Sequence, residues 1–416
     1  MALWRYWTVP GAVGPCTVWE MRIRNMAYEI VKHDQEMMRK VNKANILNLI
    51  REKKPVSRSE LARITGMSPT SVGRIVTELI ELGLIKETEL AFSRVVGRKA
   101  LLLDTEPNSV YVVCAQVDED ISRVGIVDFD GTIICERTCI CDAHSMGWDE
   151  FTDKVCGEIE KIIAEADFDK SRIIGLGIGV PGLVDTANGI VLSSPQLRWE
   201  NIRLAKYMEG RLGYKTTIDN VIKAKALAEN TYGSDRDAKR VVFVHFGTGV
   251  GSALITDNRI YRGVTNSAGE IGHTTINPNG RLCDCGRRGC LQTYITERAL
   301  LQEARTIRNI SGIDEIFEAA LKGEGWAVSI LDNLHTYISI AICNIICMYN
   351  PNTVIIGGKM VKQPPDIESI IKAKVDRQIW AQFQGSYEIK CSSLGEHAGL
   401  LGMAVLLVNK YIDIEL

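Results

Sequence analysis

Hydrophobic residues are spaced differently on the two sides of residue 107, and each side predicts its own kind of fold. Before that point, apolar positions recur every three to four residues, as they do in amphipathic helices. Four of them form the apolar face of a first helix that ends before Pro55: Ile46, Leu47, Leu49 and Ile50. After residue 107, short apolar runs alternate with helical stretches.

Two further short helices are predicted after Pro55. The second helix covers residues 59–65, with Ser57 or Ser59 as its cap, and stops at Gly66. The third helix has a good N-cap in Ser68, followed by a proline at its first position. Only a tight, glycine-containing turn remains between them, which is the arrangement of a helix-turn-helix.

The third helix has one apolar and one polar face. Its apolar stripe consists of Val72, Ile75, Val76 and Leu79. Small polar residues at its start, including Thr70 and Ser71, would permit close approach to the major groove, and Arg74 can reach a base or a phosphate. The alternative interpretation is a small helical bundle that mediates assembly.

Charge favours the DNA-binding interpretation. Residues 39–99 carry 13 Lys and Arg against 6 Asp and Glu, although the whole chain has a net charge of −2. A basic segment joined to an acidic body is typical of a nucleic-acid-binding module. Residues 84–104 predict a two-stranded wing, with Arg94, Arg98 and Lys99 at or near its tip for backbone or minor-groove contact.

The pattern after residue 107 predicts an α/β body. Its expected strands are 110–117, 123–129, 132–138, 173–180, 241–247, 252–256 and 353–358, and its expected helices lie near 148–166, 222–232, 294–306, 313–321, 325–349 and 365–380. Glycine-rich stretches at 177–185 and 245–255 would let backbone N–H groups approach an anion or a sugar, although tight turns need glycine too. Two such halves facing a cleft would suit a small ligand.

Neither a membrane span nor a signal peptide is predicted. No run of eighteen apolar residues occurs, and the tryptophan-containing residues 1–35 lack the organisation of a secretory leader, so they are interpreted as an N-terminal extension. We therefore expect a cytoplasmic protein. Its 12 cysteines are then mostly reduced thiols, and clustered ones are better candidates for metal ligands than for disulfides.

One such cluster has the spacing of a zinc site. His273 is followed by Cys283, Cys285 and Cys290, giving H-x9-C-x-C-x4-C in a glycine-rich loop. One imidazole and three thiolates suit tetrahedral zinc and leave no position for water, so the ion would be structural. The alternative is a loop of unligated side chains. The looser group of Cys139, Cys141 and His144 is not interpreted as a site.

The segments AGEIGH and CDCGRRGC, with GVPGLVD, SPQLRW, HFGTGVG and NPNTVIIGG, resemble the ROK family of repressors, open reading frames and sugar kinases. The helix-turn-helix resembles that of its xylose and N-acetylglucosamine repressor branch. The resemblance implies a winged helix-turn-helix followed by a two-lobed actin-like, ribonuclease-H-like body with a sugar pocket, assembled as a homodimer or homotetramer. The implied domains are 36–106, 107–220 and 221–416, the last with a zinc loop at 273–290 and a C-terminal helix that returns to the first lobe.

The resemblance also implies effector contacts, and the departures from it argue against catalysis. The implied effector residues are Gln196, Asn220, Glu270, His273 and Gln292. Asp118, Glu119 and Asp120 stand where the kinases have a glycine phosphate loop. Val221 stands where they have the catalytic aspartate, and valine cannot accept a proton from a sugar hydroxyl. Gln292 stands where they have a sugar-binding glutamate.

The sequence therefore predicts a zinc-containing, non-catalytic transcriptional regulator, most simply a repressor, that binds operator DNA and responds to a sugar or sugar phosphate. Two alternatives remain open. One is a bifunctional sugar kinase that also binds DNA. The other is a regulator controlled by a protein partner, in which the sugar pocket is vestigial.

Overall fold

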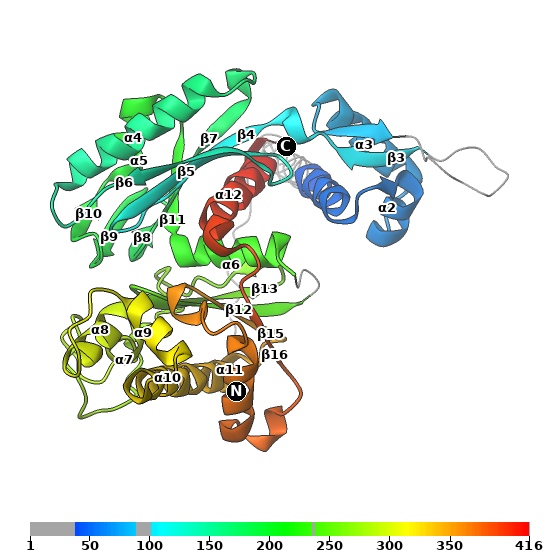
Figure 1. Cartoon of the computed structure of the whole chain (residues 1–416). Coiled ribbons are helices and arrows are strands. Elements are labelled where there is room, and N and C mark those ends of the chain that lie inside the picture. The colour runs from blue at the N-terminus through cyan, green and yellow to red at the C-terminus, as the bar shows by residue number, and fades with distance from the viewer. Residues whose placement is uncertain (1–37, 89–100, 235–237, 416) are drawn as a thin grey trace, which may run out of the picture. The chain divides into compact units, whose positions relative to one another are not determined.

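The computed structural model describes residues 38–88, 101–234 and 238–415 (Figure 1). The chain divides into two units, one formed by residues 1–105 with 412–416 and the other by residues 106–411. Arg94, Arg98 and Lys99 of the predicted wing tip, and residues 1–35, lie outside the described residues.

The first unit contains the predicted helix-turn-helix. A helix through residues 38–53 is followed by α2 (Arg58–Thr65) and α3 (Pro69–Glu81). Ser57 caps α2, Gly66 ends it in the left-handed conformation, and Ser68 caps α3 by accepting a hydrogen bond from the backbone of Ser71. The whole predicted apolar stripe of α3 is buried: Val72, Ile75, Val76 and Leu79. Three short strands, β1 (Val56–Ser57), β3 (Leu102–Thr105) and β2 (Ile85–Thr88), form an antiparallel sheet in that order.

The second unit begins with a lobe built on a five-stranded sheet in the order β11-β7-β4-β5-β6. Its strands are β4 (Tyr111–Gln116), β5 (Ile121–Asp128), β6 (Ile133–Ile140), β7 (Ile173–Val180) and β11 (Thr216–Asn220). Helices α4 (Trp148–Glu165) and α5 (Leu204–Leu212) share one core with this sheet. A small antiparallel sheet, β8 (Leu183–Asp185), β9 (Ile190–Ser194) and β10 (Trp199–Ile202), is added beside it.

The C-terminal helix α12 (Ala398–Glu415) packs on this first sheet. The approach is so close that it needs glycine. A Cβ on Gly177 of β7 would lie 3.0 Å from Leu407 Cδ1 and 3.1 Å from Met403 Cβ. Helix α12 thus completes a lobe whose strands come from residues 111–220, as Figure 1 shows in red against green and cyan.

The second lobe repeats the topology of the first. Its sheet has the order β14-β13-β12-β15-β16, with three antiparallel strands and then two parallel ones, like β6-β5-β4-β7-β11. The strands are β12 (Arg240–Phe246), β13 (Val250–Thr256), β14 (Arg259–Ile260), β15 (Thr353–Gly357) and β16 (Glu388–Cys391). The helices are α6 (Val221–Tyr232), α7 (Gln292–Ile295), α8 (Glu297–Arg305), α9 (Ile313–Leu321), α10 (Gly325–Tyr349) and α11 (Ile367–Gln378).

The helix predicted near 294–306 is two helices, α7 and α8, because Thr296 interrupts the first and caps the second by accepting a hydrogen bond from the backbone N–H of Ala299.

In the described residues α10 is the one helix long and apolar enough to cross a membrane. Its buried residues lie in the core of the second lobe, which explains that composition without a membrane.

Candidate functional site

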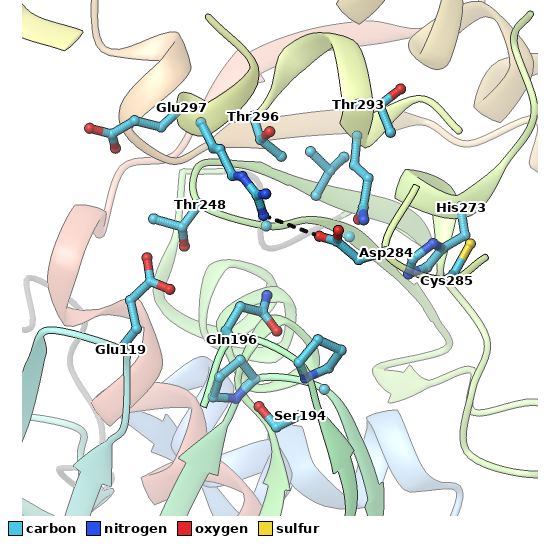
Figure 2. Close-up of a pocket in the computed structure, with 18 of the residues that line it drawn as sticks. Glu119, Ser194, Gln196, Thr248, His273, Asp284, Cys285, Thr293, Thr296 and Glu297 are labelled. Atoms are coloured by element: carbon cyan, nitrogen blue, oxygen red, sulfur yellow. Dashed lines mark hydrogen bonds and ion pairs between the residues drawn. The ribbon is translucent and has the colours of Figure 1, made fainter. Parts of the chain in front are cut away.

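A cavity of about 1310 Å³ lies in the second unit, between the small β8–β10 sheet and the loops of the second lobe (Figure 2). The first lobe supplies Ser194 and Gln196, and the second supplies the turn after β12, which includes Thr248. The predicted zinc loop and the start of α7 and α8 line the opposite side. All five predicted effector residues line this one cavity: Gln196, Asn220, Glu270, His273 and Gln292.

Asn220 has a structural task in addition to the predicted one. It is the N-cap of α6, and its Oδ1 accepts from the backbone N–H groups of Ile222 (2.8 Å) and Lys223 (3.1 Å). Its Nδ2 donates to the Gly182 carbonyl at 2.8 Å. One N–H of the amide therefore remains for a ligand, so Asn220 can act toward a sugar hydroxyl only as a donor.

Glu270 supplies the cavity with an acceptor. Burial raises the pKa of its carboxyl, and the charges of His273 and Lys223 oppose that rise. Among the described residues no side chain donates a hydrogen bond to this carboxylate. A half-buried carboxylate with free acceptor capacity is well suited to bind sugar hydroxyls.

The four predicted metal ligands gather at one end of the cavity. Their ligand atoms lie within 4.8 Å of one another, with Cys283 Sγ 3.8 Å from His273 Nδ1 and Cys285 Sγ 3.6 Å from Cys290 Sγ. In a tetrahedral zinc site with Zn–S bonds of about 2.3 Å, sulfurs stand about 3.8 Å apart, so the residues fit that ion. The backbone N–H of Arg287 lowers the pKa of Cys285 to about 6, which favours the thiolate that a metal needs.

The second cysteine group does not form a site of this kind. Cys139 Sγ and Cys141 Sγ lie 2.8 Å apart in the core of the first lobe. His144 instead lies 3.6 Å from the carboxylate of Glu119. Within the described ranges, the only gathering of three or more potential metal ligands is the one at His273.

A polar network that the sequence did not predict joins the two lobes beside the cavity. Asp219, at the end of β11, is almost fully buried and accepts from Arg262 of the second lobe through two nitrogens, at 2.6 and 3.1 Å. Asn266 accepts from Arg262 at 2.8 Å and donates to the carbonyl of Val184 in β8 at 2.8 Å. Lys223 donates to the Asn266 carbonyl. We call Asp219, Lys223, Arg262 and Asn266 the interlobe clasp.

Asp219 lies two positions before Val221, which stands where the kinases have the catalytic aspartate, and it is held by the clasp. Asp219 does not line the cavity. Its carboxylate accepts hydrogen bonds from Arg262 instead. Val221 does not line the cavity either and is buried near Gly179 of β7. Lys223 of α6 was the available signal for such a network, because a buried ammonium requires a polar environment.

The acidic stretch at 118–120, which stands where the resemblance implies a phosphate loop in the kinases, lies at one end of the cavity. Glu119 and Asp120 line the cavity there. Behind them, burial raises the pKa of Asp118, and the positive charge of Lys225 opposes that rise. Lys225 is itself buried, which lowers the pKa of its ammonium. Carboxylates at this end repel a triphosphate.

The predicted DNA-contacting residues of α3 lie on its solvent side. Thr70 and Arg74 are exposed, and Arg74 has no ion pair with any residue that the structure describes. Ser71 is half-exposed, and its hydroxyl lies 2.9 Å from that of Ser68, so it is partly engaged within the cap. Of the three predicted residues, Thr70 and Arg74 are therefore the ones that α3 exposes to solvent.

Comparison with known proteins agrees with both units. The ROK family pattern matches residues 123–410, and a pattern described as winged helix-turn-helix DNA-binding matches residues 42–86. The chain is 30% identical over 382 residues to the xylose repressor of Bacillus spizizenii, covering 92% of this chain and 98% of that one. It is 25% identical over 388 residues to the transcriptional dual regulator NagC of Escherichia coli, covering 91% and 95%.

Two solved structures of ROK family proteins have the same fold as this chain. A ROK family transcriptional regulator, a homologue of the E. coli Mlc protein, superposes with a TM-score of 0.77 at 26% identity, covering 91% of this chain and 97% of that one. A ROK family glucokinase from Streptomyces griseus, solved with glucose and AMPPNP, superposes with a TM-score of 0.64 at 25% identity, covering 71% and 98%. The fold, the family pattern and the relatives all agree, and this chain belongs to the ROK family.

Proposed function

We propose that this protein is a sugar-responsive transcriptional repressor of carbohydrate genes, not an enzyme. The observation that carries the proposal is the combination of a capped helix-turn-helix with a sugar-kinase fold that has lost its catalytic parts. Val221 replaces the general base, Arg262 occupies Asp219, and carboxylates lie at one end of the cavity. Relatives over more than nine-tenths of the chain are named repressors.

A sugar or sugar phosphate is the proposed effector. Gln196 and Asn220 would bind it from the first lobe, and Glu270, His273 and Gln292 from the second. A ligand that bridges both lobes stabilises their closed arrangement, and an effector can shift a regulator only through such a difference in affinity. The relatives named for xylose and N-acetylglucosamine make these sugars the first candidates.

Zinc is the proposed metal, held by His273, Cys283, Cys285 and Cys290. With four protein ligands the ion has no open position, so it would fix the loop that lines the cavity and would take no part in a reaction. The donor set supports this role, because three thiolates and one imidazole favour zinc over calcium or magnesium.

The DNA partner is proposed to be a pseudo-palindromic operator bound by a homodimer, or by a homotetramer, in the cytoplasm. Thr70, Ser71 and Arg74 would face the major groove, and Arg94, Arg98 and Lys99 would contact the backbone or minor groove. A two-fold dimer presents two recognition helices about one helical turn of DNA apart. Effector-driven closure would change that spacing and weaken DNA binding.

The test is fluorescence anisotropy of the zinc-loaded protein on labelled DNA from upstream of its own gene, with scrambled DNA at the same salt concentration as control. A panel of free and phosphorylated sugars, including D-xylose and N-acetylglucosamine, is then titrated into the complex. We expect selective binding that one sugar releases. Selective binding that no sugar releases would favour control by a protein partner. Steady ATP consumption with a sugar would refute the non-catalytic assignment.

A further inference from the structure

We propose that Gln292 is a positioning residue that ties the metal loop to the effector cavity. Its amide Nε2 donates to Cys283 Sγ, and this bond holds Oε1 as a hydrogen-bond acceptor at the cavity. The inference rests on the proposed function for the identity of the metal. It concerns a residue that the family resemblance presents only as a replacement for a sugar-binding glutamate.

The Gln292 amide lies between a cysteine sulfur and a glycine. Gln292 is the first residue of α7, two positions after the ligand Cys290, and it lines the cavity. Its Nε2 lies 3.3 Å from Cys283 Sγ, within the range of N–H···S hydrogen bonds. On the other side Oε1 lies against Gly272, where even a Cβ would come within 3.2 Å of it. In this orientation the amide nitrogen faces the sulfur and the oxygen faces Gly272.

Charge favours a hydrogen-bond donor at this position. Three thiolates and a neutral imidazole around Zn²⁺ leave the centre with a net negative charge. An N–H donor stabilises a metal-bound thiolate, whereas an ionised carboxylate at the same distance would repel it. The backbone N–H of Arg287 gives Cys285 the same kind of donor. Gln292 therefore does for Cys283 what the loop backbone does for Cys285.

The orientation has a consequence for the ligand. Because the amide nitrogen faces the sulfur, the oxygen is the group left for the effector. Gln292 then offers a sugar hydroxyl an acceptor, as a glutamate would, without placing a second negative charge beside the thiolates. Asn220 offers a donor, so the two side chains are complementary parts of one binding surface.

The first test is metal affinity of the full-length protein. Gln292→Met keeps the length of the side chain and removes the donor, and Gln292→Glu replaces it with a carboxylate. Gln302→Met is the matched control, because Gln302 lines the same cavity from α8 and has no hydrogen bond to a cysteine among the described residues. Zinc affinity is measured by competition with a chelator, and the cobalt-loaded protein reports the metal–thiolate bonds by its absorption.

We expect Gln292→Met to weaken zinc binding by about tenfold, as loss of an outer-shell partner does, and Gln292→Glu by more. The charge-transfer bands of the cobalt form should shift in both, and Gln302→Met should match the wild type. Equal zinc affinity and an unchanged cobalt spectrum in Gln292→Met would overturn the proposal. An unchanged urea midpoint followed by tryptophan fluorescence shows that the second unit of a variant is folded, because the tryptophans that the structure describes all lie in that unit.

A second readout separates this inference from the proposed function. If a sugar releases the wild-type protein from DNA, Gln292→Met should need a higher concentration of that sugar, whereas Gln378→Met, at an exposed position of α11 outside the cavity, should not. If no sugar releases the wild type, the effector assignment fails while the zinc measurement still decides the role of Gln292. If the wild type takes up no zinc, the metal assignment fails and this inference fails with it.

Discussion

Replacing Arg262 by methionine tests the interlobe clasp at its most buried point. Asp219 has only 3% of its side chain exposed and depends on Arg262 for two short hydrogen bonds. In Arg262→Met its carboxylate keeps only a hydrogen bond from the backbone of Asn220, at 2.7 Å. Breaking a buried ion pair by removing one partner costs about 3–5 kcal/mol.

The expected loss lies at the lower end of that range. Arg262 is 32% exposed, so water can reach the space that it leaves, and the ammonium of Lys223 lies close enough to act on the remaining charge. We therefore expect about 3 kcal/mol of lost stability in the second unit. Urea unfolding followed by tryptophan fluorescence measures it, because the tryptophans that the structure describes all belong to this unit: Trp148, Trp199, Trp326 and Trp380.

Two controls make the result specific. Arg259→Met removes an exposed arginine three residues earlier and should change stability by less than about 0.5 kcal/mol. The double variant Asp219→Asn with Arg262→Met removes the stranded charge and should be more stable than the sum of the single losses predicts. If Arg262→Met unfolds at the same urea concentration as the wild type, the ion pair between Asp219 and Arg262 does not contribute to the stability of the second unit.

Three further predictions follow from other parts of the molecule. Arg74→Ala should weaken operator binding by about 1–3 kcal/mol in anisotropy titrations, with a smaller loss on scrambled DNA. Removal of zinc with a chelator, or Cys283→Ser, should lower the urea midpoint of the second unit and leave the helix-turn-helix folded by NMR. Burial lowers the pKa of His335 to about 4, so the unfolded chain binds its proton first as pH falls. The protein should lose about 3 kcal/mol between roughly pH 6.5 and 4, a loss that is absent in His335→Gln when unfolding is measured across that range.

The sequence predicted best those features whose determinants are local. The caps of α2 and α3 and the buried stripe of α3 follow from a few adjacent residues, and all are present. The predicted metal ligands also lie close together along the chain, and their side chains converge in space. Local chemistry of this kind needs no knowledge of the rest of the fold.

Features that depend on distant partners were not predicted. The strand β11 carries polar residues such as Asp219, and its burial makes sense only with Arg262, 43 positions later. The strands β8, β9 and β10 are too short to show a period of their own. The break at Thr296 was missed because the apolar spacing continues across it, whereas its hydroxyl caps α8. In each case a tertiary contact overrides a weak local pattern.

The Lys225 ammonium and the carboxylates of residues 118–120 have a consequence at the level of the cell. The Streptomyces griseus glucokinase of this fold was solved with both glucose and the nucleotide analogue AMPPNP, so a protein of this fold can bind a nucleotide as well as a sugar. In this protein, carboxylates of residues 118–120 and the nearby ammonium of Lys225 place fixed charges at one end of the cavity. Two cells with equal concentrations of the sugar and very different concentrations of ATP would then keep the same fraction of their operators occupied.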